Sequence, residues 1–103
     1  VEQFKVLLLN RANKVIGIYE VSSGTTVNTV ADPKSVFVAA LKANAVAVII
    51  SHNHPSGNLT PSEADRKLTK DLKDAGKFLH IPVLDHIIIT SEAYYSFADE
   101  GLL

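Results

Sequence analysis

The sequence predicts an α/β (α+β) fold in which a mixed β-sheet is flanked by helices. Short apolar segments at residues 4–9, 45–50 and 83–90 have the length and composition of buried strands. The segments that follow Asp32 and Pro61 carry apolar side chains at helical spacing. The expected element order, β-β-β-α-β-α-β-α, is typical of helices packed on a sheet.

The first two strands are expected to form a hairpin. Residues 4–9 and 15–21 are apolar segments on either side of a polar turn at residues 10–14. Residues 22–24 then break the second strand. A short third strand is expected at residues 25–30.

A helix and a buried strand are expected next. Asp32 is a good N-cap, and Pro33 suits the first helical position. The helix is expected to end near Asn44. The wholly apolar segment 45–50 is typical of a strand covered on both faces, and a polar loop is expected at residues 51–60.

The second half contains a second long helix. Thr60 and Glu63 have the spacing of a capping box around Pro61, which predicts a helix start there. The apolar stripe of this helix consists of Leu68, Leu72, Ala75 and Leu79. Gly76 falls near the helix end, and Pro82 prevents its continuation.

The chain is expected to end with a strand at residues 83–90 and a short helix. Ser91 is the expected cap of that helix, which would run through Phe97 and stop at Gly101. His80 is expected to be a surface residue where the long helix ends.

Composition narrows the classes of protein. The 103 residues are 47% hydrophobic and 20% charged, the balance of a globular protein, and residues 1–103 are expected to form one domain. The absence of cysteine excludes disulfides and thiolate metal sites. A net charge of −1 argues against direct nucleic-acid binding, and no apolar run is long enough to span a membrane. We therefore expect a cytoplasmic protein; because Val1 is not an initiator methionine, we expect a fragment of a longer one.

Three residues have the chemistry of a metal site. His52 and His54 stand two apart after an apolar segment, so in an extended chain both rings point to the same side. Asp65 shares the apolar face of the predicted helix with Leu68 and Leu72. A carboxylate there is costly unless it is paired or binds a metal. Two histidines and one carboxylate with an open fourth position are typical of catalytic zinc.

Each feature also has a simpler interpretation. Asp65 would be stabilised by the helix dipole near a helix start. Ser62 would bond to the backbone there, and residues 55–58 are ordinary turn chemistry. Taken together, with the acid on the apolar face, the residues favour a metal site.

The pattern His52-x-His54, seven residues, Ser62, two residues, Asp65 resembles the zinc signature of the JAMM (JAB/MPN) metalloprotease domains. The resemblance implies a JAB/MPN-like (cytidine-deaminase-like) sandwich. It also implies that His52, His54 and Asp65 bind Zn²⁺ with water in the fourth position. Ser62 would stabilise the oxyanion, and Glu20 would be the catalytic glutamate.

The longer string from His52 to Gly57, with Pro61-Ser62 and residues 85–89, is similar to the bacterial RadC family in particular. This similarity extends from Phe4 to Phe97. RadC-like proteins usually carry a helical N-terminal region, so the resemblance implies a C-terminal fragment.

Three further residues have open roles. Glu20 is the only acid in its predicted strand, which fits a catalytic base or an exposed edge residue. Asn53 stands where many proteases of the superfamily have Ser or Thr, so substrate alignment is expected to differ. His86 follows Asp85 in a strand and is expected to be a core histidine or, through a hydrogen bond to a carboxylate, a support behind the metal ligands.

The expected function is zinc-dependent hydrolysis of amide bonds in a protein or peptide substrate. A zinc nucleobase deaminase is excluded because its Pro-Cys-x-x-Cys half requires cysteine. A two-metal phosphoesterase would need more acids near the loop. The main alternative is a non-catalytic zinc-containing binding or scaffold module, associated with DNA repair through a region outside these residues.

Overall fold

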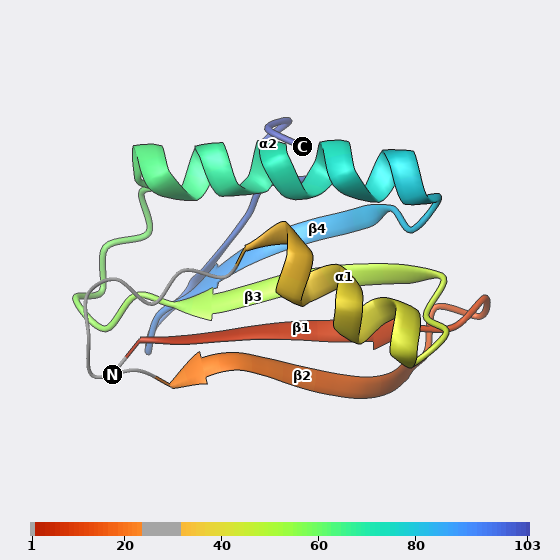
Figure 1. The fold of residues 1–103 in the computed structure, drawn as a ribbon. Helices are drawn as coiled ribbons and strands as arrows, with labels where there is room; N and C mark the ends of the chain where they lie inside the picture. Colours follow the sequence, from red (N-terminus) through yellow and green to blue (C-terminus); the bar gives the residue numbers. More distant parts are fainter. Residues whose placement is uncertain (1, 24–31) are drawn as a thin grey trace.

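The computed structural model describes residues 2–23 and 32–103, and within them one mixed sheet is present (Figure 1). Its strand order is β2-β1-β3-β4-β5. The strands are β1 Gln3–Leu9, β2 Val15–Ser23, β3 Ala47–Asn53, β4 Val83–Ile89 and β5 Tyr94–Ser96. β3 and β4 run parallel, whereas the other neighbouring pairs are antiparallel. The predicted α+β class with a mixed sheet is therefore confirmed.

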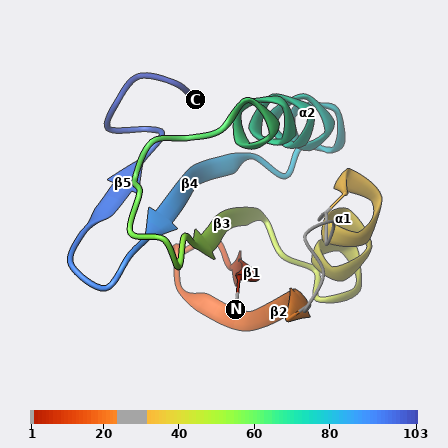
Figure 2. The ribbon, with the colours of Figure 1, turned by 90° about the vertical axis from the view of Figure 1, so that its left-hand side faces the viewer.

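Two helices, α1 (Pro33–Lys42) and α2 (Glu63–Leu79), pack on the same side of this sheet (Figure 2). The side chains between helices and sheet form the hydrophobic core, and the fully buried ones include Val6, Val36, Val48, Ile50 and Leu72. Alternation along β1 and β3 directs every second side chain into this core. Residues of β3 on the core side therefore face the layer that α1 and α2 form.

The predicted hairpin and the first helix are confirmed. β1 pairs antiparallel with β2, and Asn13 adopts the positive φ of 59° that the turn between them requires. The side chain of Asp32 accepts a hydrogen bond from the backbone N–H of Ser35, as expected of an N-cap. The third strand predicted at residues 25–30 lies outside the described residues.

The boundary of β3 differs from the prediction. The strand continues through Ser51 and His52 to Asn53, so the loop expected at residues 51–60 begins later. Pairing with β1 on one side and β4 on the other extends the strand, because both neighbours supply backbone partners to polar residues. The helices cover only one face of β3, and Ile49 on the other face stays partly exposed, so the expected burial of both faces was wrong.

The start of α2 also differs from the prediction. Ser62, not Thr60, is the N-cap: its Oγ accepts from the backbone N–H of Asp65 at 3.0 Å. The Asp65 carboxylate in turn accepts from the backbone N–H of Ser62 at 2.8 Å. The capping box is therefore shifted by two residues, and Asp65 takes the place predicted for Glu63.

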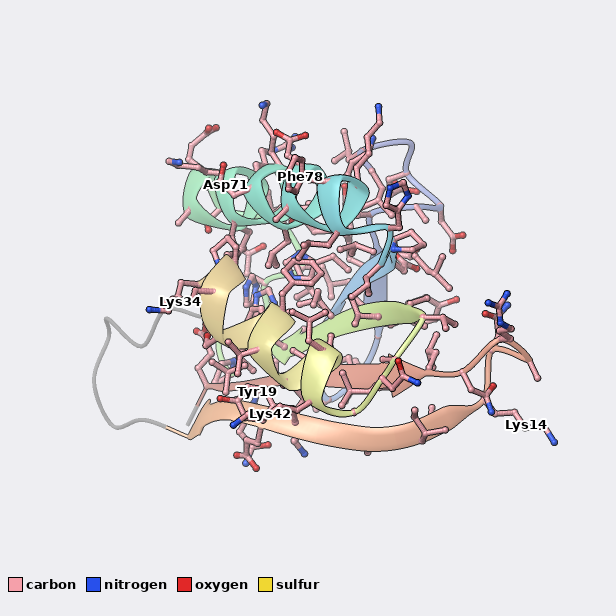
Figure 3. The ribbon with its side chains drawn as sticks, turned by 45° about the vertical axis from the view of Figure 1, so that its right-hand side comes forward. Lys14, Tyr19, Lys34, Lys42, Asp71 and Phe78 are labelled. Atoms are coloured by element: carbon pink, nitrogen blue, oxygen red, sulfur yellow. The ribbon has the colours of Figure 1, made fainter. Side chains whose placement is uncertain are left out.

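The outer face of α2 is mainly polar, although the apolar side chain of Phe78 is exposed on it. Lys67 pairs with Asp71 and Lys70 with Asp74 across one helical turn, and Asp71 and Phe78 point away from the sheet (Figure 3). At the inner face a Cβ added to Gly76 would lie 2.4 Å from the backbone oxygen of Ile81. Glycine thus allows the returning chain to pass close to the helix.

The predicted final helix was wrong. The chain instead reverses at Thr90, whose Oγ1 accepts from the backbone N–H of Ala93, and β5 then pairs antiparallel with β4. The Asp85 carboxylate accepts from the Ser96 hydroxyl at 2.6 Å and from the Ala98 N–H at 3.0 Å. These contacts between distant residues outweigh the local helix-start signal at Ser91.

Candidate metal centre

The end of β3 presents two histidines to one point. His52 is buried on the core side of the strand, opposite Phe4 of β1, and the two rings stack at a centroid distance of 5.6 Å. His54 lies two residues later, and its Nε2 is 2.9 Å from His52 Nε2. The expected convergence of the two rings is therefore present.

Asp65 meets both histidines from the first turn of α2. Its Oδ1 lies 3.3 Å from His52 Nε2, and its Oδ2 lies 3.3 Å from His54 Nε2. One ligand atom from each of the three residues lies within 4.8 Å of the others. The capping box with Ser62 holds the carboxylate in this position.

Asp65 supplies the negative charge in the group formed by His52, His54 and Asp65. Burial by itself raises the pKa of the Asp65 carboxyl, but contacts with the His52 ring and the Ser62 N–H outweigh it and hold the pKa well below its usual value. The carboxylate is therefore ionised at neutral pH. A half-buried negative charge beside two imidazoles is an environment that favours a cation.

Both histidines are supported from behind. His54 Nδ1 lies 2.8 Å from the backbone oxygen of Asn58, and a carbonyl oxygen only accepts, so His54 Nδ1 carries the hydrogen. With Nδ1 used in this way, Nε2 is the ring nitrogen of His54 that remains to bind a metal ion. His52 Nδ1 lies 2.8 Å from Nε2 of the buried His86. Hydrogen bonds of this kind orient metal-binding histidines in proteins.

His86 is built into the core behind His52. Its ring stacks on Phe97 at 4.6 Å, and its Nδ1 lies 2.5 Å from Thr69 Oγ1. Burial lowers the pKa of His86 to about 3, so the ring is neutral at physiological pH. The two ring nitrogens of His86 contact Thr69 and His52 rather than the Asp85 carboxylate, because strand alternation points the Asp85 and His86 side chains to opposite faces. Asp85 accepts from the backbone N–H of His86 instead.

Two supporting residues were not singled out from the sequence. Thr69 lies one helical turn after Asp65, and that i,i+4 spacing is the signal that could have identified it. Asn58 contributes a backbone oxygen, so its side-chain type carried no signal. Loop geometry alone brings that oxygen to His54.

The donor set fits a metal ion. Two imidazole nitrogens, 2.9 Å apart, and an ionised carboxylate oxygen surround one point. Nitrogen and oxygen donors in this number suit Zn²⁺ and related first-row ions. Within residues 2–23 and 32–103, His52, His54 and Asp65 are the one group of three His, Cys, Asp or Glu side chains whose ligand atoms lie close enough together to hold a metal ion.

Ser62 and Asn53 lie next to the group. Ser62 is exposed, and its Oγ accepts from Asp65 N–H, so capping does not use its hydroxyl hydrogen. Asn53 Oδ1 accepts from the backbone N–H of Gln3 at 2.5 Å, which ties the end of β3 to the start of β1. Asn53 thus supports the strand from which His52 and His54 project.

The structure does not bring Glu20 into the group. Its side chain is exposed, and the residue pairs with Lys5 of β1, while its neighbours Tyr19 and Val21 pack against the core. A register shift between Phe4 and Lys5 leaves Val21 as an extra residue in β2. Such a bulge re-aims the side chains beside it.

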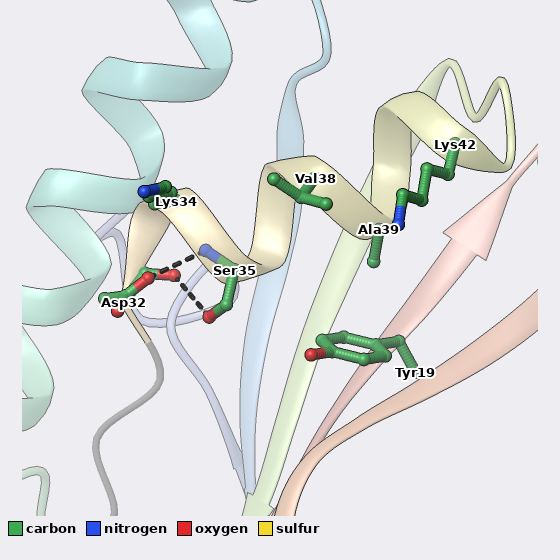
Figure 4. A pocket seen from close by; sticks show the side chains of 7 residues that line it. All are labelled: Tyr19, Asp32, Lys34, Ser35, Val38, Ala39 and Lys42. Carbon is green, nitrogen blue, oxygen red and sulfur yellow. Dashed lines mark hydrogen bonds between the residues drawn. The ribbon is translucent and has the colours of Figure 1, made fainter.

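A separate hollow lies between α1 and the edge strand β2 (Figure 4). Its volume is about 390 Å³, and Tyr19 forms its floor between Lys34 and Lys42. The hydrogen bonds of Asp32 with Ser35 close one end. The hollow does not include His52, His54 or Asp65, but Tyr19 lies opposite Val6, two residues along β1 from Phe4.

Neither α1 nor α2, the helices of the described ranges, is long and apolar enough to cross a membrane.

Comparisons with known proteins agree with this geometry. A family model described as "RadC-like JAB domain" matches residues 1–102. The chain is 48% identical over 101 residues to a UPF0758 protein of Flavobacterium johnsoniae. The match covers 98% of this chain and 44% of the relative. It is 47% identical over 103 residues to a UPF0758 protein of Symbiobacterium thermophilum, covering 100% of this chain and 44% of that protein. The chain therefore spans less than half the length of these relatives.

Proposed function

The chain belongs to the RadC-like JAB domain family, and from that premise we propose that it is a zinc-dependent hydrolase of amide bonds in a protein or peptide. The observation that carries the proposal is the convergence of His52, His54 and Asp65 within 4.8 Å. Three ligands leave one position of a tetrahedral zinc ion open, as hydrolytic sites require.

Each residue then has a chemical task. His52, His54 and Asp65 would hold the metal, which supplies a Lewis acid and lowers the pKa of water. Ser62, whose hydroxyl hydrogen is not used in capping, would donate to the oxyanion that develops on the scissile carbonyl. Glu20 would accept the proton of the attacking water and return it to the leaving amine. For this task the end of β2 would have to rearrange when substrate binds, because Glu20 pairs with Lys5 and Lys5 with Ser51, on the face of the sheet opposite His52.

A polypeptide substrate suits the surface beside β2. Among the strands of residues 2–23 and 32–103, β2 lies at the edge of the sheet, and an extended peptide can pair with such an edge through its backbone. The hollow next to it offers the Tyr19 ring for an apolar side chain, with Lys34 and Lys42 for acidic groups (Figure 4).

One observation favours a second candidate, a metal-containing binding or scaffold module. Glu20 is exposed and pairs across the strands with Lys5 rather than approaching Asp65 or the histidines. Without a proton acceptor near the metal, hydrolysis would be slow. The metal would then serve to join the end of β3 to α2.

Paired substitutions separate these two functions. In a hydrolase, Glu20→Gln retains zinc near one ion per chain while cleavage of a fluorogenic peptide-amide library falls by roughly 10²–10⁴-fold. His52→Ala loses zinc and activity together, because the ligand is removed. Zinc content is measured by atomic emission after dialysis.

The control is Glu92→Gln, which makes the same chemical change at an exposed residue of the turn before β5. It is expected to keep both zinc and activity. A zinc-loaded wild-type chain that cleaves nothing in the library beyond its chelated form would favour the scaffold function. A His52→Ala variant that keeps its zinc would refute the metal site itself.

A further inference from the structure

A chain of buried polar contacts runs from α2 to the metal group. Thr69 Oγ1 donates to the backbone oxygen of Asp65 at 2.8 Å and lies 2.5 Å from His86 Nδ1. His86 Nε2 lies 2.8 Å from His52 Nδ1, and His52 Nε2 faces His54 and Asp65. Thr69, His86 and His52 are each at most 3% exposed, so water does not replace these partners.

The direction of these hydrogen bonds follows from Thr69. Its hydroxyl has one hydrogen, and the Asp65 carbonyl oxygen can only accept. With that hydrogen donated to Asp65, the contact with His86 requires a hydrogen on His86 Nδ1. A neutral His86 then has a bare Nε2, which accepts from His52 Nδ1–H. His52 Nε2 is left with a free lone pair.

The opposite direction is incompatible with metal binding. If His86 carried its hydrogen on Nε2, His52 Nδ1 would have to accept, and the His52 hydrogen would sit on Nε2, facing Asp65 Oδ1 at 3.3 Å. That nitrogen could not bind a metal. The same arrangement would leave the 2.8 Å contact between Thr69 Oγ1 and Asp65 O without a hydrogen, which is repulsive. In the proposed direction the contact without a hydrogen is the 2.9 Å contact between His52 Nε2 and His54 Nε2, and that is the position where a metal ion would bind.

We propose that Thr69 and His86 are positioning residues that select the Nδ1–H tautomer of His52 and so aim its Nε2 lone pair at the metal position. The proposal rests on the metal site of the proposed function. It adds that Thr69 and His86 orient His52 for binding before a metal ion is present. The stacking of His86 on Phe97 and of His52 on Phe4 fixes the planes of both rings. Ring rotation therefore cannot substitute for the selection of the tautomer.

Thr69→Val tests the proposal because valine has nearly the same shape but cannot accept from His86 Nδ1–H. The His86 hydrogen is expected to move to Nε2, where His52 Nδ1 accepts it. Zinc affinity, measured by competition with a chelator, is expected to fall by roughly 10–100-fold, the usual effect of losing such a support. Long-range ¹H–¹⁵N spectra of the metal-free chain report the tautomers of His52 and His86 directly.

Two variants control for other effects. Thr69→Ser keeps the hydroxyl and is expected to keep wild-type tautomers and affinity. Leu72→Val disturbs the same buried face of α2 without touching the polar chain, so it is expected to lower the melting temperature and leave the tautomers unchanged.

Either of two results would overturn the proposal. One is a metal-free wild-type chain in which His86 carries its hydrogen on Nε2. The other is a folded Thr69→Val variant that binds zinc as tightly as the wild type, whatever its tautomers. A wild-type chain that binds no zinc would instead refute the proposed function, and the tautomer spectra would still decide the direction of the hydrogen bonds.

Discussion

Replacing Ser62 with alanine should separate a structural task from a catalytic one. The Ser62 Oγ accepts the Asp65 backbone N–H at 3.0 Å as the N-cap of α2. Loss of such a cap typically costs about 1 kcal/mol. For a domain of this size, about 1 kcal/mol corresponds to a fall of roughly 4–8 °C in melting temperature. The backbone N–H of Ser62 still donates to the Asp65 carboxylate, so zinc affinity should change little.

The melting temperature is measured by circular dichroism in the presence of chelator, because bound metal would add its own stabilisation. Ser62→Asn retains an N-cap oxygen but not the hydroxyl, and is expected to melt close to the wild type. If Ser62 also donates to the oxyanion, peptide cleavage by Ser62→Ala should fall by roughly 10²–10³-fold at a temperature where the variant is folded. Ser62→Asn, whose amide N–H groups can donate, should keep more of the rate.

Ser91→Ala is the matched control, since Ser91 is also exposed but does not cap a helix. A Ser62→Ala variant that melts at the temperature of Ser91→Ala would refute the assignment of the cap. A Ser62→Asn variant as unstable as Ser62→Ala would refute it equally.

Two further predictions concern the pH dependence of stability and the order of the loop beside His52, His54 and Asp65. Burial lowers the pKa of His86 from 6.5 to about 3, so the unfolded chain binds more protons than the folded one between these values. The contribution of His86 to the free energy of unfolding of the metal-free chain should therefore be complete above pH 6.5 and should fall by about 1 kcal/mol per pH unit below it. Denaturant titrations across that range should show a weaker dependence of the free energy of unfolding on pH for His86→Phe than for the wild type. Chelation should speed hydrogen exchange in the loop from His54 to Ser62, where His54 and Asp65 would share the ion, while the hairpin turn at residues 10–14 stays unchanged. Equal exchange rates in the loop with and without chelator would mean that the metal does not order it.

Local sequence signals predicted the elements that carry the metal group. Alternation in an extended chain placed His52 and His54 on one side, and helical spacing placed Asp65 on the inner face of α2. The Asp32 cap and the β1–β2 hairpin also depend on residues a few positions apart. Such contacts can be anticipated because short stretches of backbone have few allowed geometries.

Local sequence signals gave a wrong prediction at the end of the chain, where contacts between distant residues decide the structure. Ser91 has the chemistry of a helix cap, yet residues 94–96 join the sheet because Ser96 bonds to Asp85, eleven positions earlier. The bulge at Val21, which leaves Glu20 exposed, depends on the pairing of β2 with β1. In each case strand pairing decides the conformation, and local propensity is the weaker term.

The residue types and spacing of His52, His54 and Asp65 are therefore enough to indicate a metal site, because its ligands come from one strand end and the helix that follows it. The support behind the site was predictable only in part: the sequence left His86 between a core role and a supporting one, and the hydrogen bonds that join His86 and Thr69 to the site depend on the tertiary structure. His86 and Thr69 lie 34 and 17 residues from His52, and nothing in their own sequence neighbourhoods specifies a hydrogen bond to it or to each other. The parallel pairing of β3 with β4 and the packing of α2 above both strands bring these polar groups together, since a buried hydrogen bond needs a partner fixed in space rather than one nearby in the chain.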